Sequence, residues 1–167
     1  MTKADHQRLV LAGPIEVRKE ILEAQTEWMI GHRGKAFEAL FASLQEKLKR
    51  AFITENRVYL VASSGTGFWE AASRNCIRDD QKALHFTSGS FSERWADISK
   101  ANGKQVDVVS VEWGQAITPE IVAEALQNGT HYDAVCVVHN ETSTSVTNPI
   151  AAIGEAVREM KARMNEE

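Results

Sequence analysis

The feature that most constrains the fold is an alternation of short apolar runs and helical segments from about residue 57 onward. Four β-prone runs lie at 58–62, 83–86, 106–111 and 134–138, and each is followed by apolar residues at helical spacing. The runs are apolar on both faces, as parallel strands covered by helices must be. The pattern therefore predicts a doubly wound α/β protein with a mainly parallel sheet, and with ligands at the carboxyl ends of its strands.

The first part of the chain has a different character. Apolar residues recur at helical spacing from Pro14 to Trp28 and again over roughly 35–51, with a glycine-containing break between the two stretches. We therefore expect an N-terminal helical arm over 1–52, followed by the sheet domain over 53–167.

Composition excludes several other classes of protein. The 167 residues are 43% hydrophobic and 25% charged, which is typical of a folded globular domain. A formal net charge of −4 provides no basic surface for nucleic acid, and no apolar run is long enough for a membrane span. The start lacks the apolar core of a signal peptide, and the two cysteines have no neighbouring zinc ligands. We expect a cytoplasmic protein without a metal site.

Polar segments follow three of the predicted strands, where a ligand is expected. Residues 63–67 read Ser-Ser-Gly-Thr-Gly, which is either a phosphate cradle with free N–H groups and hydroxyls or an ordinary strand-to-helix turn. The segment is neither a dinucleotide fingerprint nor a Walker loop, which argues against a nucleoside triphosphate. Phe91 either stacks on a flat ligand or belongs to the core with Trp95 and Ile98. Residues 139–145 are all polar, so they line a surface or a polar site.

Taken in order, these segments resemble the N-terminal part of the class V aminotransferases, pyridoxal-phosphate enzymes of fold type I. The subgroup they resemble most is that of the alanine–glyoxylate and serine–glyoxylate (serine–pyruvate) aminotransferases. The matching residues are Gly13-Pro14, Gly31-His32-Arg33, Ser64-Gly65-Thr66-Gly67 with Glu70-Ala71-Ala72, Gly89-Ser90-Phe91 with Arg94, and His139-x-Glu141-Thr142-Ser143-Thr144. The motif departs from the family at Ser145, where a glycine is usual. The resemblance implies that 53–167 is the first half of the cofactor-binding large domain.

The resemblance also implies a set of cofactor contacts. Ser64, Gly65 and Thr66 would hold the phosphate of pyridoxal 5'-phosphate. Phe91 occupies the position whose ring stacks on the pyridine, and Thr142 would hydrogen-bond near the ring hydroxyl.

For catalysis, the resemblance implies that this chain is incomplete. Gly13 and Pro14 would lie in a loop over the substrates, a small amino acid such as alanine or serine and a 2-oxo acid such as glyoxylate or pyruvate. The family's Schiff-base lysine and the aspartate that pairs with the pyridine nitrogen follow later in the fold than Met164. The chain would therefore supply no catalytic residue and would be inactive alone. Its partner would be a second copy of the intact enzyme in a homodimer, or the complementary C-terminal half.

The expected topology gives a test of this interpretation. In fold type I the sheet order is 3-2-4-5-6-7-1, so the second, third and fourth predicted strands should be neighbours, while 58–62 should find none. Pairing of 58–62 with 83–87 or 134–139 would contradict that topology. Two alternatives stay open: a non-catalytic α/β domain that binds a phosphorylated ligand or a partner protein, and another class V activity, cysteine desulfurase-like or phosphoserine aminotransferase-like.

Overall fold

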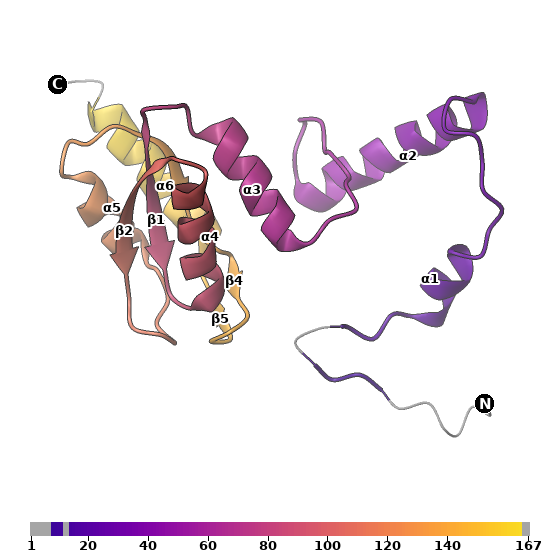
Figure 1. Ribbon diagram of the computed structural model, residues 1–167, viewed down its shortest axis with the longest axis horizontal. Helices are drawn as coiled ribbons and strands as arrows, with labels where there is room; N and C mark the ends of the chain where they lie inside the picture. Colours follow the sequence, from indigo (N-terminus) through magenta and orange to yellow (C-terminus); the bar gives the residue numbers. More distant parts are fainter. Residues whose placement is uncertain (1–7, 12–13, 165–167) are drawn as a thin grey trace. The chain divides into compact units, whose positions relative to one another are not determined.

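A computed structural model of the chain describes residues 8–11 and 14–164. It consists of two compact units, Met1–Ala62 and Ser63–Glu167, which are considered separately (Figure 1). The first unit contains helices α1 (Lys19–Ala24) and α2 (Lys35–Phe52). The second contains α3 (Gly65–Cys76), β1 (Lys82–Thr87), α4 (Ser90–Ala101), β2 (Gln105–Ser110), α5 (Pro119–Leu126), β3 (Tyr132–Cys136), β4 (Asn140–Glu141), β5 (Val146–Thr147) and α6 (Ile150–Met164).

The first unit is helical, as predicted, but not to the predicted extent. Helix α2 covers the expected residues and ends where Ile53 takes a left-handed conformation, with φ of 50°. Helix α1 has only six residues and buries none of them, so the prediction of a helix from Pro14 to Trp28 is wrong. Helix nucleation costs free energy, and a short helix that buries no side chain gains little packing energy to offset it. The spacing of apolar residues does not show whether a helix will be packed.

The strand predicted at 58–62 does not form. Residues 57–64 have no regular secondary structure. The main chain of Val58 is instead held by the Gln45 amide, which donates to the Val58 carbonyl at 2.7 Å and accepts from its N–H at 3.2 Å. A strand exists only where a neighbour satisfies its N–H and C=O groups, so β-prone composition without a neighbour is not sufficient. This outcome agrees with the fold type I topology, in which 58–62 finds no neighbour among the other predicted strands.

The second unit contains a three-stranded parallel sheet in the order β2-β1-β3. This is the order predicted for the second, third and fourth strands. Strand β1 is central and almost wholly buried, and residues 82–87 pair in register with residues 105–110 of β2. A two-stranded antiparallel hairpin, β4–β5, follows β3 and includes most of the polar segment 139–145.

The core lies on the face of the sheet covered by α5 and α6. Leu84 and Phe86 of β1 pack there against the buried residues Ile117, Val122, Leu126, Ile153 and Met160. Helix α5 begins as the sequence predicted, with Thr118 accepting from the Ile121 N–H and with Pro119 in the first turn.

The other face of β1 is polar. His85, only 1% exposed, meets the edge of the Trp95 ring of α4 at a centroid distance of 5.5 Å. Nearby, the hydroxyls of Ser73 in α3 and Ser99 in α4 lie 2.8 Å apart. The interpretation that every strand is apolar on both faces is therefore wrong for β1. No helix in the described part of the chain has the length and hydropathy needed to cross a membrane.

Candidate functional site

The polar segments singled out in the sequence gather at one end of the second unit. Figure 1 shows that α3 and α4 both begin at the end toward which the β1 and β2 arrows point, and that the β4–β5 hairpin lies there too. The carboxyl ends of parallel strands are the usual place for a ligand in α/β proteins. Direct hydrogen bonds join the start of α4 to the segment after β3, as described below.

Helix α3 begins at Gly65, so the Ser-Gly-Thr-Gly segment forms its N-cap and first turn. Ser64 is the N-cap, and its Oγ accepts from the Gly67 N–H at 3.3 Å. Helix geometry leaves the N–H groups of Gly65 and Thr66 without an intrahelical acceptor. A Cβ added at Gly65 would meet no atom within 4 Å, so the approach to this turn is open.

Helix α4 begins very differently, because its first N–H groups are already bound within the chain. Ser90 N donates to Ser143 Oγ at 3.0 Å. Phe91 N and Ser92 N donate to the two carboxylate oxygens of Glu141, at 3.3 and 2.9 Å. The Ser143 hydroxyl also donates to Glu141, at 2.6 Å. The carboxylate of the hairpin therefore caps the helix.

Gly89 permits this close contact. A Cβ at position 89 would lie 2.5 Å from Ser143 Oγ and 2.6 and 2.7 Å from two carbons of the Glu141 side chain. Any side chain there would displace the buried carboxylate, so the glycine of the Gly89-Ser90-Phe91 segment is required by packing against the hairpin.

Hydrogen bonds also hold the hairpin at the end opposite its turn. Buried Asn148 accepts from the Ile117 N–H and donates to the Val138 carbonyl, both at 2.7 Å. Between the two strands Ser145 has φ of 58°, in the left-handed region that glycine adopts most readily. The departure from the family motif at this position is thus a serine that tolerates the conformation of a glycine.

Phe91 belongs to a line of aromatic side chains that connects the two helices. The residue is 36% exposed, and its ring centroid lies 6.1 Å from that of Trp69 in α3, which in turn stacks on Trp95 at 6.1 Å. Phe91 is therefore neither fully core nor free, with one side packed and the other accessible. Thr142 is exposed, and no hydrogen bond joins its hydroxyl to the described residues.

Some buried polar atoms beside this site have no partner in the described chain: His85 Nε2, Ser88 Oγ and Trp95 Nε1. Burial, with a smaller contribution from the charge of Lys100, lowers the pKa of His85 to about 4, so its imidazole is neutral at neutral pH. His85 is thus a buried histidine with an unsatisfied ring nitrogen.

The two residues predicted to lie near the substrates belong to the first unit and are described separately. Pro14 is exposed in the first unit, and Gly13 lies outside the described residues. No cluster of three or more metal-ligating side chains occurs among residues 8–11 and 14–164. Sequence reasoning did not single out Trp69, Ser92 or Asn148, because their importance depends on contacts with residues far away in the chain.

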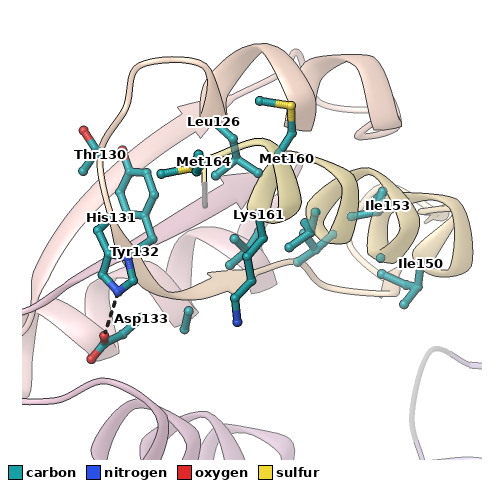
Figure 2. Close-up of a pocket in the computed structure, with 15 residues that line it drawn as sticks. Leu126, Thr130, His131, Tyr132, Asp133, Ile150, Ile153, Met160, Lys161 and Met164 are labelled. Carbon is teal, nitrogen blue, oxygen red and sulfur yellow. Dashed lines mark ion pairs between the residues drawn. The ribbon is translucent and has the colours of Figure 1, made fainter. Parts of the chain in front are cut away.

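A separate cavity of about 630 Å³ lies beside β3 and α6, away from the residues just described (Figure 2). Its lining is mostly apolar and includes Val135, Ile153 and Met160, with the His131–Asp133 ion pair at one end. Strand β3 is an edge of the sheet, so this cavity borders an unpaired strand edge. None of the predicted cofactor residues lines it.

Comparison with known proteins identifies the family to which this arrangement belongs. The family model described as Aminotransferase class-V matches residues 16–165. The chain belongs to the class V aminotransferases. It is 43% identical to an uncharacterized aminotransferase of Methanocaldococcus jannaschii over 154 residues, 92% of this chain and 40% of that protein. It is 36% identical to the serine–glyoxylate aminotransferase of Methylorubrum extorquens over 152 residues, 89% of this chain and 38% of that protein.

The structure of this class V chain matches that of solved relatives. The alanine–glyoxylate aminotransferase of Nostoc sp. superposes with a TM-score of 0.81 at 28% identity, over 95% of this chain and 44% of that one. The predicted family and its fold type I large-domain architecture are therefore confirmed. The chain spans about two-fifths of the length of these relatives.

Proposed function

We propose that the chain is the N-terminal part of a pyridoxal-phosphate-dependent aminotransferase. The intact enzyme transfers an amino group from a small amino acid, alanine or serine, to a 2-oxo acid, glyoxylate or pyruvate. Relatives named for serine–glyoxylate and alanine–glyoxylate transfer support these substrates. We further propose a cytoplasmic homodimer, in which Gly13 and Pro14 lie near the substrates.

The observation that carries the proposal is the open first turn of α3. Its N–H groups and the Ser64 and Thr66 hydroxyls offer hydrogen-bond donors, and the helix dipole favours a negative charge. Among the described residues, no atom lies within 4 Å of a Cβ placed at Gly65. These donors fit a phosphate, while the accessible side of Phe91 fits a flat ring.

In this proposal, each of the predicted site residues makes one kind of contact with the cofactor. Ser64, Gly65 and Thr66 bind the phosphate, Phe91 stacks on the ring, and Thr142 donates a hydrogen bond at the ring's polar edge. The cofactor, when bound, supplies an electron sink that this chain's side chains lack. The residues of this chain bind and orient the cofactor, and the proposed lysine and aspartate belong to the rest of the enzyme.

The open edge of β3 supports the view that more of the sheet is needed. Within the part of the chain that the structure describes, β3 pairs with β1 alone, and the apolar cavity beside its other edge is large enough to accept further side chains. We propose that the remaining part of the enzyme supplies the next strand here and completes both the sheet and the active site.

Cofactor binding tests the proposal directly. Added pyridoxal 5'-phosphate should quench the fluorescence of Trp69, which lies beside Phe91, and Ser64→Ala should weaken that binding about tenfold. Thr118→Ala is the matched control, because it removes the equivalent cap of α5, on the other face of the sheet. Quenching that is equally affected by both substitutions, or absent in the unaltered chain, would contradict the proposed function.

Activity requires the missing part. A chimera that joins residues 1–167 to the unmatched portion of the Methanocaldococcus relative should transfer the amino group of alanine or serine to glyoxylate, while the 167-residue chain alone should not. A non-catalytic domain that binds a phosphorylated ligand would instead bind the cofactor but give an inactive chimera.

A further inference from the structure

The two helices that begin at the candidate site offer different surfaces to an anion. The N–H groups of Gly65 and Thr66 in α3 have no acceptor within the chain's helix. By contrast, the first three N–H groups of α4 are bound by Ser143 and Glu141. One helix N-terminus is therefore open, and the other is filled by the chain itself.

Glu141 is an unusual group to find in this position. It is fully buried, and no cation pairs with it among the described residues. Burial acts to raise its pKa, but hydrogen bonds from Ser143, Ser92 and the Phe91 N–H outweigh burial and lower it. The side chain is thus ionised at neutral pH and serves as an internal anion at the positive end of α4.

The same carboxylate connects two residues proposed to contact the cofactor. It binds the main chain of Phe91 directly, across 50 residues of sequence, and Thr142 is the next residue after it. A shift of the carboxylate would therefore move the stacking ring and the hydroxyl of Thr142 together, while leaving the first turn of α3 in place.

We propose that Glu141 is a positioning residue for the cofactor ring. It closes the N-terminus of α4 to external anions, which leaves α3 as the phosphate site, and it fixes the main chain of Phe91 and the neighbouring Thr142 relative to each other. This inference rests on the proposed function.

The test compares two probes in the full chain, pyridoxal 5'-phosphate and inorganic phosphate, by following main-chain amide resonances in NMR titrations. Glu141→Gln keeps the side-chain volume but removes the charge. It should raise the Kd of pyridoxal 5'-phosphate about tenfold. The Kd of inorganic phosphate, followed at Gly65 and Thr66, should stay unchanged, because that ion needs only α3.

Three further variants separate positioning from stability. Ser143→Ala removes one hydrogen bond to the carboxylate and should raise the Kd of pyridoxal 5'-phosphate about threefold in a chain that remains folded. Glu155→Gln makes the same chemical change on the exposed surface of α6 and should affect neither probe. Val122→Ala destabilises the core on the other face of the sheet and should leave the ratio of the two Kd values unchanged.

The outcomes are distinguishable. If the unaltered chain binds neither probe, the proposed function fails and the inference falls with it. If the unaltered chain binds pyridoxal 5'-phosphate and both Glu141→Gln and Ser143→Ala bind it equally well, the positioning role is wrong while the proposed function stands. A loss of affinity that is the same for both probes would also overturn the positioning role, since it would mark a general loss of structure.

Discussion

Acidification should destabilise this protein through His85. Its side chain is 1% exposed, and burial lowers its pKa from 6.5 to about 4. In the unfolded chain the imidazole takes up a proton near pH 6.5, whereas in the folded chain it does so only near pH 4. The stability that the neutral ring provides is therefore complete above pH 6.5 and is lost as the pH falls toward 4.

The magnitude follows from the two pKa values. A difference of one pKa unit corresponds to about 1.4 kcal/mol, so the full effect is about 3 kcal/mol. Between pH 7.5 and pH 5.0 about 2 kcal/mol of this is lost. That loss is a substantial share of the free energy of unfolding of a domain of ordinary stability.

Urea unfolding of the chain and of His85→Gln at both of these pH values measures the contribution of His85 to the free energy of unfolding. Tryptophan fluorescence serves as the signal, because Trp95 contacts the imidazole. Other acidic groups titrate equally in both proteins, so only the difference between them matters. The free energy of unfolding of the unaltered chain should fall by about 2 kcal/mol more than that of the variant. An NMR titration should place the His85 midpoint near pH 4. Parallel pH profiles for the two proteins, or a midpoint near 6.5, would refute the reasoning.

Other predictions concern single positions. Gly89→Ala should destabilise the chain by about 1–3 kcal/mol in urea unfolding, because its Cβ overlaps the hairpin, whereas Gly65→Ala should have little effect on stability. Ser145→Val should destabilise by about 1–2 kcal/mol, because a β-branched residue resists φ of 58°, and Ser145→Gly should not; equal melting temperatures would contradict this. Burial, with a smaller contribution from Cys76, raises the pKa of the Cys136 thiol to about 12. Alkylation of the native chain at pH 8 should therefore modify exposed Cys76 and leave Cys136 unmodified, as mass spectrometry of peptides would show.

The parts of the fold that the sequence predicted correctly depend on local signals. Thr118 and Pro119 mark the start of α5 by themselves, because cap and first-turn preferences act over a few residues. The order of the three parallel strands followed from the family resemblance rather than from spacing. The run at 58–62 has the composition of a strand but no neighbour, and a single sequence does not show which neighbours are present.

For the candidate site, the sequence indicated which segments to consider but not how they interact with one another. The sequence drew attention to the loops that carry Ser64, Phe91 and Thr142, because polar residues after buried strands are informative. It could not show that Glu141, one of several polar residues in a row, is the buried member, since its partner Ser92 lies 49 residues away. Nor could it show that a hairpin shapes the segment, because the paired strands have only two residues each.

The strand order has a consequence for how the molecule is built during synthesis. Because β1 is central and both of its neighbours follow it, the three parallel strands that the structure describes all lie between Lys82 and Cys136. A nascent chain can therefore assemble this sheet, and pack α5 against it, as soon as that stretch has left the ribosome. In the proposed intact enzyme, the unpaired edge of β3 would then be the template on which the next strand is added.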